Sequence, residues 1–162
     1  MDNDKYFNKL NINCKNAINL QDFKDNIEIT IKDLLYTTEK GYIEGLTNII
    51  ITKLKNMETN KKPFYCSNKT KLEFYIKTEN TWQKDTNDHI DKFIDFVTKK
   101  QIDMIKVWTD ENLEWLETED GSELYLNIVQ QVMGGGTDEI RIKNKKNIKR
   151  NIGVETSLKD II

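Results

Sequence analysis

Apolar side chains recur at three- and four-residue steps in the first forty residues, the spacing of one stripe along an α-helix. The positions on this stripe are Leu20, Phe23, Ile27, Ile31, Leu34 and Leu35. The stretch 27–31 also alternates between apolar and polar residues, so a strand is a second option there. Lys40-Gly41 interrupts the pattern and Gly45 interrupts it again. We therefore expect helical structure up to about residue 40.

The segment 46–57 predicts a further helix, because its apolar and polar side chains fall on opposite sides of a helical wheel. The apolar side carries Leu46, Ile49, Ile50, Leu54 and Met57. The polar side carries Asn48, Thr52, Lys55 and Asn56. The β-branched run 49–51 favours a strand. We prefer a helix because the apolar stripe continues beyond that run.

Alternation over 72–77 predicts a β-strand, with Leu72, Phe74 and Ile76 on one face. Glu73, Tyr75 and Lys77 lie on the other face. A turn at 78–80 and a return strand at 81–84 complete a hairpin. The short run 63–66 predicts a third strand, because a proline suits the first position of a strand.

Helical spacing returns after residue 88, on a stripe formed by Ile90, Ile94, Val97, Ile105 and Trp108. Thr109, followed by two acidic residues, resembles the N-cap of a shorter helix that carries Leu113, Trp115 and Leu116. The segment 120–122 predicts a turn and cap, and 124–133 predicts another helix. The glycines at 134–136 should end that helix. They lack the preceding strand and following Lys-Ser/Thr of a phosphate-binding P-loop.

The order helix, short turn, helix, hairpin is typical of winged-helix modules. We therefore predict an α+β fold that is mainly helical, with a central β-hairpin, a winged-helix-like core and C-terminal helices. The core covers about 20–86 and the helical part 88–134, within a single domain 1–136. Residues 137–162 should form a basic C-terminal arm, either an amphipathic helix or a mobile segment.

Charge is unevenly distributed along this chain of 162 residues, although 25 basic and 27 acidic residues nearly cancel. The stretch 85–125 holds twelve acidic residues and four lysines, whereas 141–150 holds six basic residues and no acidic one. This excludes a uniformly basic nucleic-acid binder and leaves a polarised one. No apolar run approaches the roughly 18 residues of a membrane span, so no membrane partner is expected.

The winged-helix order suggests contacts with DNA. The polar face of 46–57 offers amides and a hydroxyl for base edges, while hairpin and arm lysines suit phosphates. The candidate nucleic-acid-binding residues are Asn48, Thr52, Lys55, Asn56, Lys69, Lys71, Lys77, Arg141, Lys143, Lys145, Lys146, Lys149 and Arg150. A solvated helical face is the simpler interpretation. No arginine, the commonest reader of guanine, precedes residue 141, which favours backbone contacts over base readout. Tyr75 and Trp82 fit base stacking or cross-strand packing equally well.

Residues suited to catalysis or metal binding are few. His89 is the only histidine and reads as a surface residue near a helix start, while Cys14 and Cys66 lack CxxC spacing. The candidate acidic ligands are not spaced as in a calcium loop, so a solvated helical face is the preferred interpretation; they are Asp91, Asp95, Asp103, Asp110 and Glu111. We expect no enzymatic activity, no cofactor and no metal. The start lacks the basic and apolar regions of a signal peptide, which predicts an intracellular protein.

Two runs carry a family resemblance: 41–51 followed by Leu54, and Lys62-Pro63-Phe64-Tyr65-Cys66-Ser67-Asn68. They resemble segments of an uncharacterised protein family of nucleocytoplasmic large DNA viruses (giant viruses), the second matching its Arg-Pro-Ile-His-Cys-Thr-Asp signature. The match extends over about 40–136, through the segment 125–135. Tyr65 stands where the family usually has histidine, and Lys71 where it has arginine. The resemblance implies a viral origin and supplies no catalytic residues.

The composition agrees with that origin, because 23 of the 25 basic residues are lysine and the chain holds 21 isoleucines and 18 asparagines, as an AT-rich genome would encode. We therefore expect a non-enzymatic viral nucleic-acid-binding or nucleoprotein adaptor module in the host cytoplasm or virion. Its partners would be DNA, bound through the backbone, and viral proteins. The alternative is a protein-interaction or virion-structural module that docks a viral partner or self-associates, for example as a homodimer.

Overall fold

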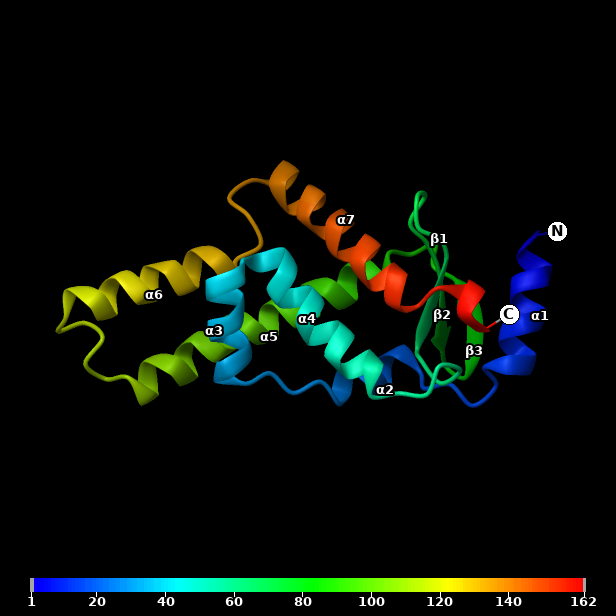
Figure 1. Ribbon diagram of the computed structural model, residues 1–162, viewed down its shortest axis with the longest axis horizontal. Helices are drawn as coiled ribbons and strands as arrows, with labels where there is room; N and C mark the ends of the chain where they lie inside the picture. Colours follow the sequence, from blue (N-terminus) through cyan, green and yellow to red (C-terminus); the bar gives the residue numbers. More distant parts are fainter. Residues whose placement is uncertain (1, 162) are drawn as a thin grey trace. The chain divides into compact units, whose positions relative to one another are not determined.

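The computed structural model describes residues 2–161 and is mainly helical with one antiparallel sheet (Figure 1), which confirms the predicted α+β class. Its helices are α1 (Asp2–Asn13), α2 (Leu20–Asp25), α3 (Ile31–Lys40), α4 (Tyr42–Lys55), α5 (His89–Glu111), α6 (Glu119–Val132) and α7 (Asp138–Glu155). The strands are β1 (Phe64–Asn68), β2 (Glu73–Thr78) and β3 (Thr81–Lys84), and a 3-10 turn, η1 (Leu158–Ile161), follows α7.

The chain forms two compact units that interleave along the sequence. The sheet unit comprises the chain up to Ile27, Ile50–Phe93 and the chain from Lys149. The helical unit comprises Glu28–Ile49 and Ile94–Ile148. The division does not follow the predicted boundary between residues 136 and 137, because the end of the chain belongs to the same unit as its beginning. The predicted winged-helix-like core is likewise divided between the two units, with α3 in the helical unit and the hairpin in the sheet unit.

The sheet of the sheet unit has the order β1-β2-β3, with Tyr65 opposite Tyr75 and Ile76 opposite Gln83. The predicted hairpin and third short strand are therefore confirmed. One face of the sheet packs aromatic rings of α2 and α5. The Phe64 ring lies 6.3 Å from that of Phe23 and 5.9 Å from that of Phe93, measured between centroids. Such ring clusters combine a large buried area with favourable edge contacts.

The opposite face of the sheet is also covered, so central strand β2 is buried on both sides. The Tyr75 ring lies 5.5 Å from the Tyr6 ring and 5.2 Å from the Phe7 ring, both carried by α1. The buried residues of this layer are Leu10, Cys14, Ala17, Tyr65, Tyr75, Trp82 and Leu158. The alternating pattern of 72–77 thus separates two buried faces instead of a buried and a solvated one.

The C-terminal segment is an integral part of the sheet unit. The Cys66 amide donates to the Thr156 carbonyl at 2.8 Å, and a short parallel bridge joins Cys66 to Ser157. Gly153 of α7 sits so close to β1 that an added Cβ would lie 3.1 Å from Cys66 Sγ. Ile152 is fully buried. Of the two forms predicted for the arm, the structure has the helix.

The predicted stripe over 20–35 does not form one helix. A short segment with neither helix nor strand separates α2 from α3, and Thr30 starts α3 with a capping box in which Thr30 and Asp33 bond each other's amides. Leu34 is buried here, but Leu35 is 39% exposed. Neither a continuous helix nor a strand spans 27–31, because the chain passes there from one unit to the other.

The two glycines of 41–45 have different roles. Gly41, with φ 97°, ends α3 as predicted. Gly45 was predicted to break the pattern but lies inside α4, where an added Cβ would come within 2.1 Å of Thr37 Oγ1. Its role is therefore to let α3 and α4 approach closely.

The connection between α5 and α6 also differs from prediction. Thr109 is not an N-cap, since α5 continues through it to Glu111 and its hydroxyl donates to the Lys106 carbonyl. The segment after α5 forms turns and leaves Leu113 77% exposed. The cap of α6 is Thr118, which accepts the Gly121 amide, so the expected turn and cap at 120–122 lie within the first turn of the helix.

Candidate nucleic-acid interface

The predicted polar face of α4 is exposed. Asn48, Thr52 and Lys55 all lie on the outer side of this helix, and Asn56 follows its last residue. On the apolar stripe opposite them, Leu46, Ile50 and Leu54 are fully buried. The amphipathic pattern read from the sequence therefore corresponds to one solvated and one packed face.

The hairpin lysines separate into two kinds. Lys69 and Lys71 are exposed in the turn between β1 and β2. Lys77 is only 5% exposed, and its ammonium donates to the carbonyls of Lys15 at 2.9 Å and Ala17 at 2.8 Å. The prediction that Lys77 contacts nucleic acid is therefore wrong. The reason is that its face of β2 is covered by α1 and the turn that follows it.

The two hairpin aromatics are structural. Tyr75 is 1% exposed between Tyr6 and Phe7, and Trp82 is 5% exposed with its indole N–H donating to the Cys14 carbonyl at 3.2 Å. Of the two interpretations left open, packing holds and base stacking does not, because neither ring is available to a base.

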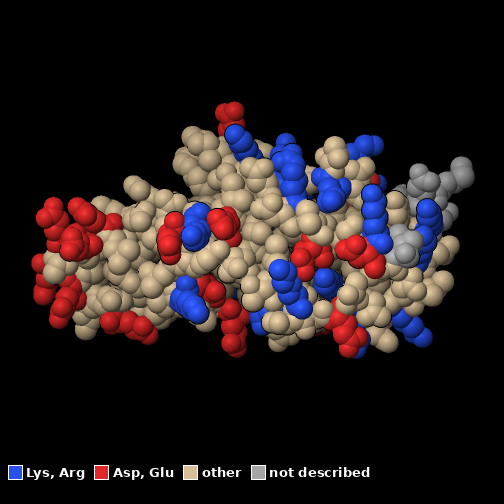
Figure 2. Space-filling model, in the orientation of Figure 1, with Lys and Arg blue, Asp and Glu red and all other residues tan. Residues whose placement is uncertain are grey.

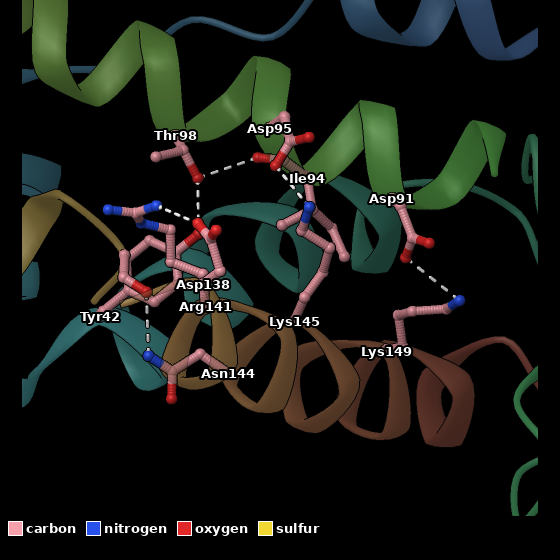
Figure 3. A network of polar contacts seen from close by, with 11 residues as sticks. Tyr42, Asp91, Ile94, Asp95, Thr98, Asp138, Arg141, Asn144, Lys145 and Lys149 are labelled. Carbon is pink, nitrogen blue, oxygen red and sulfur yellow. Dashed lines mark hydrogen bonds and ion pairs between the residues drawn. The ribbon is translucent and has the colours of Figure 1, made fainter. Parts of the chain in front are cut away.

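The basic residues of 141–150 are presented by α7, and several are already paired (Figure 3). In the helical unit, Lys145 Nζ lies 2.7 Å from Asp95 Oδ1, and in the sheet unit, Lys149 Nζ lies 3.2 Å from Asp91 Oδ1. Both aspartates belong to α5. An ammonium held by a carboxylate contributes less to binding a phosphate, because the carboxylate must be displaced or left beside the new anion.

Side chains near the start of α7 form hydrogen bonds with the glycine turn that precedes this helix. Arg141 pairs with Asp138 at 2.8 Å (Figure 3). Arg141 also donates to the Gly135 carbonyl, and Asn144 donates to the Gly134 carbonyl. The remaining predicted basic residues of this helix are exposed and are Lys143, Lys146 and Arg150.

The structure also brings together residues that the sequence did not single out. In the sheet unit, residues of α1, β1 and η1 line a half-open cavity of about 280 Å³; they are Lys5, Tyr6, Lys9, Ser67, Leu158 and Lys159. The four-residue spacing of Lys5 and Lys9 was a local signal, because it places both on one side of a helix. Nothing local connects them to Lys159.

A second concave surface lies in the helical unit, at the connection of α5 and α6. This acidic groove has a volume of about 550 Å³ and is lined by Trp108, Asp110, Glu111, Asn112, Leu113, Glu114, Trp115, Thr118, Gly121 and Leu124. Trp115 stacks on Tyr125 with centroids 4.2 Å apart. Figure 2 shows acidic side chains gathered at this connection. The groove therefore combines apolar surface with negative charge.

Groups suited to nucleophilic or metal chemistry do not converge in either surface. Both cysteines are free and buried, and burial raises the pKa of the Cys66 thiol to about 11. His89 is the first residue of α5, where the Asp85 carboxylate accepts its amide at 2.8 Å. Among residues 2–161, no group of three or more His, Cys, Asp or Glu side chains could hold a metal ion. Every helix in the same range is too short or too polar to cross a membrane.

Comparison of the chain with protein-family models, with curated proteins and with solved structures found no match.

Proposed function

We propose that this chain is a non-enzymatic nucleic-acid-binding or nucleoprotein adaptor module of a DNA virus, acting in the host cytoplasm or the virion. The sheet unit would bind the backbone of DNA. One observation supports this most: the sheet unit holds sixteen basic and twelve acidic residues, a formal charge of +4, whereas the helical unit holds nine and fifteen, a charge of −6. The charge of the whole chain conceals this difference.

The contact residues we propose are exposed and belong to the predicted set. Lys55, Lys69 and Lys71 supply ammonium groups from α4 and the β1–β2 turn, and Asn56 supplies an amide. Backbone binding of this kind reads charge and not sequence, because phosphate contacts carry no base information. The absence of arginine from these positions fits that mode.

The test is fluorescence anisotropy of a labelled 20-base-pair duplex at increasing salt concentrations. Each lysine that neutralises a phosphate contributes about −0.9 to the slope of log K against log salt. The triple variant Lys55→Gln, Lys69→Gln, Lys71→Gln should therefore bind more weakly, with a slope smaller by about 2.7. The matched control is Lys99→Gln, Lys106→Gln, which removes helical-unit lysines that pair with Asp103 and Asp110. No retention of the duplex at about 50 mM salt would refute the proposal.

A second function, protein interaction, is favoured by the acidic groove of the helical unit. Its rim carries apolar side chains, with Leu113 77% and nearby Leu116 71% exposed. In this alternative the module docks a viral partner or self-associates. Light scattering of the native chain and of Leu113→Ser, Leu116→Ser tests it: an assembly that the double variant disperses supports the alternative, and a monomer that binds only DNA contradicts it.

A further inference from the structure

The basic cavity of the sheet unit is built from three segments that are far apart in the sequence. Lys5, Tyr6 and Lys9 come from α1, Ser67 from β1, and Leu158 with Lys159 from η1. The η1 segment is held against β1 by the backbone bridge between Cys66 and Ser157, next to the residues that line the cavity. The arrangement is therefore a product of the tertiary fold and not of one flexible loop.

The charge of this basic cavity is one-sided. Three of the six lining residues are lysines, and among the described residues that line it none is acidic. Within the described side chains, Lys5, Lys9 and Lys159 form no ion pair, in contrast to Lys61, Lys84 and Lys149 of the same unit. Three lysines that line one small space give it a positive charge, which favours binding of an anion there.

The remaining lining residues add hydrogen-bonding groups and an apolar base. Ser67 offers a hydroxyl, which donates to the Glu73 carbonyl at 3.3 Å in the structure and can rotate toward a ligand. Tyr6 offers a phenol on a ring that is fixed against Tyr75. Leu158, which is 1% exposed, contributes an apolar lining residue. The volume of about 280 Å³ lies just below the range of drug-sized ligand sites, so it suits one small charged group.

We propose that this cavity binds a phosphomonoester. Such a group carries close to two negative charges at neutral pH and three acceptor oxygens, which matches three ammonium groups and two hydroxyls. The phosphate can come from the end of a nucleic-acid strand or from a free nucleotide. The cavity is lined by none of Lys55, Lys69 and Lys71, so this proposal can be tested independently of duplex binding by those residues.

The experiment uses the full chain and isothermal titration calorimetry with four probes. Two are single-stranded dodecamers that differ only in a 5′-phosphate or a 5′-hydroxyl, and two are adenosine 5′-monophosphate and adenosine. The phosphorylated member of at least one pair should bind about tenfold or more tightly than its partner, which is the effect of one charge-assisted contact. Lys9→Gln and Lys159→Gln should each remove about tenfold of that preference, and Lys9→Arg should retain most of it.

The control variant is Lys15→Gln, an exposed lysine of the sheet unit outside the cavity, which should leave the preference unchanged. A preference confined to the dodecamers identifies a strand end as the ligand, and a preference shared with the monophosphate identifies the phosphomonoester alone. Equal binding of phosphorylated and unphosphorylated probes, or a preference that survives Lys9→Gln and Lys159→Gln in circular-dichroism-verified folded protein, overturns the proposal. Duplex binding that persists in those variants leaves the proposed function intact.

Discussion

In the sheet unit basic residues outnumber acidic ones by sixteen to twelve, whereas in the helical unit acidic residues outnumber basic ones by fifteen to nine. The units also differ in what they bury. The sheet unit packs aromatic rings against both faces of its sheet, while the helical unit leaves leucines exposed beside its acidic groove. A chain whose net charge is close to zero can therefore consist of two units of opposite net charge, +4 for the sheet unit and −6 for the helical unit.

The largest change in the free energy of unfolding is expected from a substitution in the packed core of the sheet unit. Phe64→Ala removes a fully buried ring from between Phe23, Phe74 and Phe93, and should lower the free energy of unfolding by about 3–5 kcal/mol. Leu113→Ala, at an exposed position of the helical unit, should change it by less than about 0.5 kcal/mol. Urea unfolding followed by circular dichroism measures both. Similar losses in the two variants would contradict the comparison.

Thiol reactivity provides a second test of how the sheet unit differs from the helical unit, because both cysteines lie in the sheet unit. Burial raises the pKa of Cys66 from 9.0 to about 11, so at pH 8 its thiolate fraction, and its reaction with a disulfide reagent, should be about a hundredfold lower than for an exposed thiol. The folded chain therefore holds the Cys66 proton more tightly than the unfolded chain does. The stability from this group is therefore fully present below pH 9 and declines as the pH rises toward 11.

The measurement is the rate of thiol modification in native buffer and in urea. A native rate equal to the unfolded rate would show that water reaches the thiols and that the sheet unit is not closed as described. Cys66→Ser separates the contribution of this residue from that of Cys14, whose pKa burial also raises.

A smaller effect tests the close contact between α3 and α4 in the helical unit. Gly45→Ala places a methyl group 2.1 Å from Thr37 Oγ1, so α3 and α4 must separate, at a cost of about 2 kcal/mol in the free energy of unfolding. Gly136→Ala is the matched control, because an added Cβ there has no described atom within 4 Å. Thermal unfolding should show a lower Tm for the first variant only. A neutral Gly45→Ala would mean that the two helices are not in close contact.

The last effect concerns Lys77, a buried lysine of the sheet unit. Lys77→Met leaves the carbonyls of Lys15 and Ala17 without their donor and should cost about 1–2 kcal/mol of stability, with no change in the salt dependence of DNA binding. Lys71→Gln should show the reverse: unchanged stability and a salt slope smaller by about 0.9. Anisotropy and urea unfolding of the same two variants distinguish the roles. A changed slope for Lys77→Met would restore it to the interface.

Much of the fold could be predicted because periodicity is a local property. The two-residue alternation of 72–77 gave β2, and the three- and four-residue spacing gave α4 and the long part of α5, since each pattern follows from backbone geometry alone. The predictions were wrong at positions where packing against other parts of the chain determines the local structure. Thr109 has the chemistry of a cap, yet α5 continues past it, and Gly45 has the chemistry of a breaker, yet it serves a helix contact.

The candidate surfaces were less predictable for the same reason. Exposure of Lys55, Lys69 and Lys71 agreed with the local pattern, whereas burial of Lys77 depends on α1, more than sixty residues away. The pairing of Lys145 and Lys149 with α5 likewise depends on contact between helices distant in the chain. The residues next to a side chain in the sequence do not indicate which distant segment covers it.

The α+β class, the hairpin, most helices and the uneven placement of charge follow from local spacing and composition, so the amino-acid sequence is enough to predict them. Contacts between distant segments are needed to see that the C-terminal basic segment packs as α7 and η1, that β2 is covered on both faces, and that Lys5, Lys9 and Lys159 line one cavity. Such contacts are driven by the hydrophobic effect, and a local pattern does not specify which segments meet.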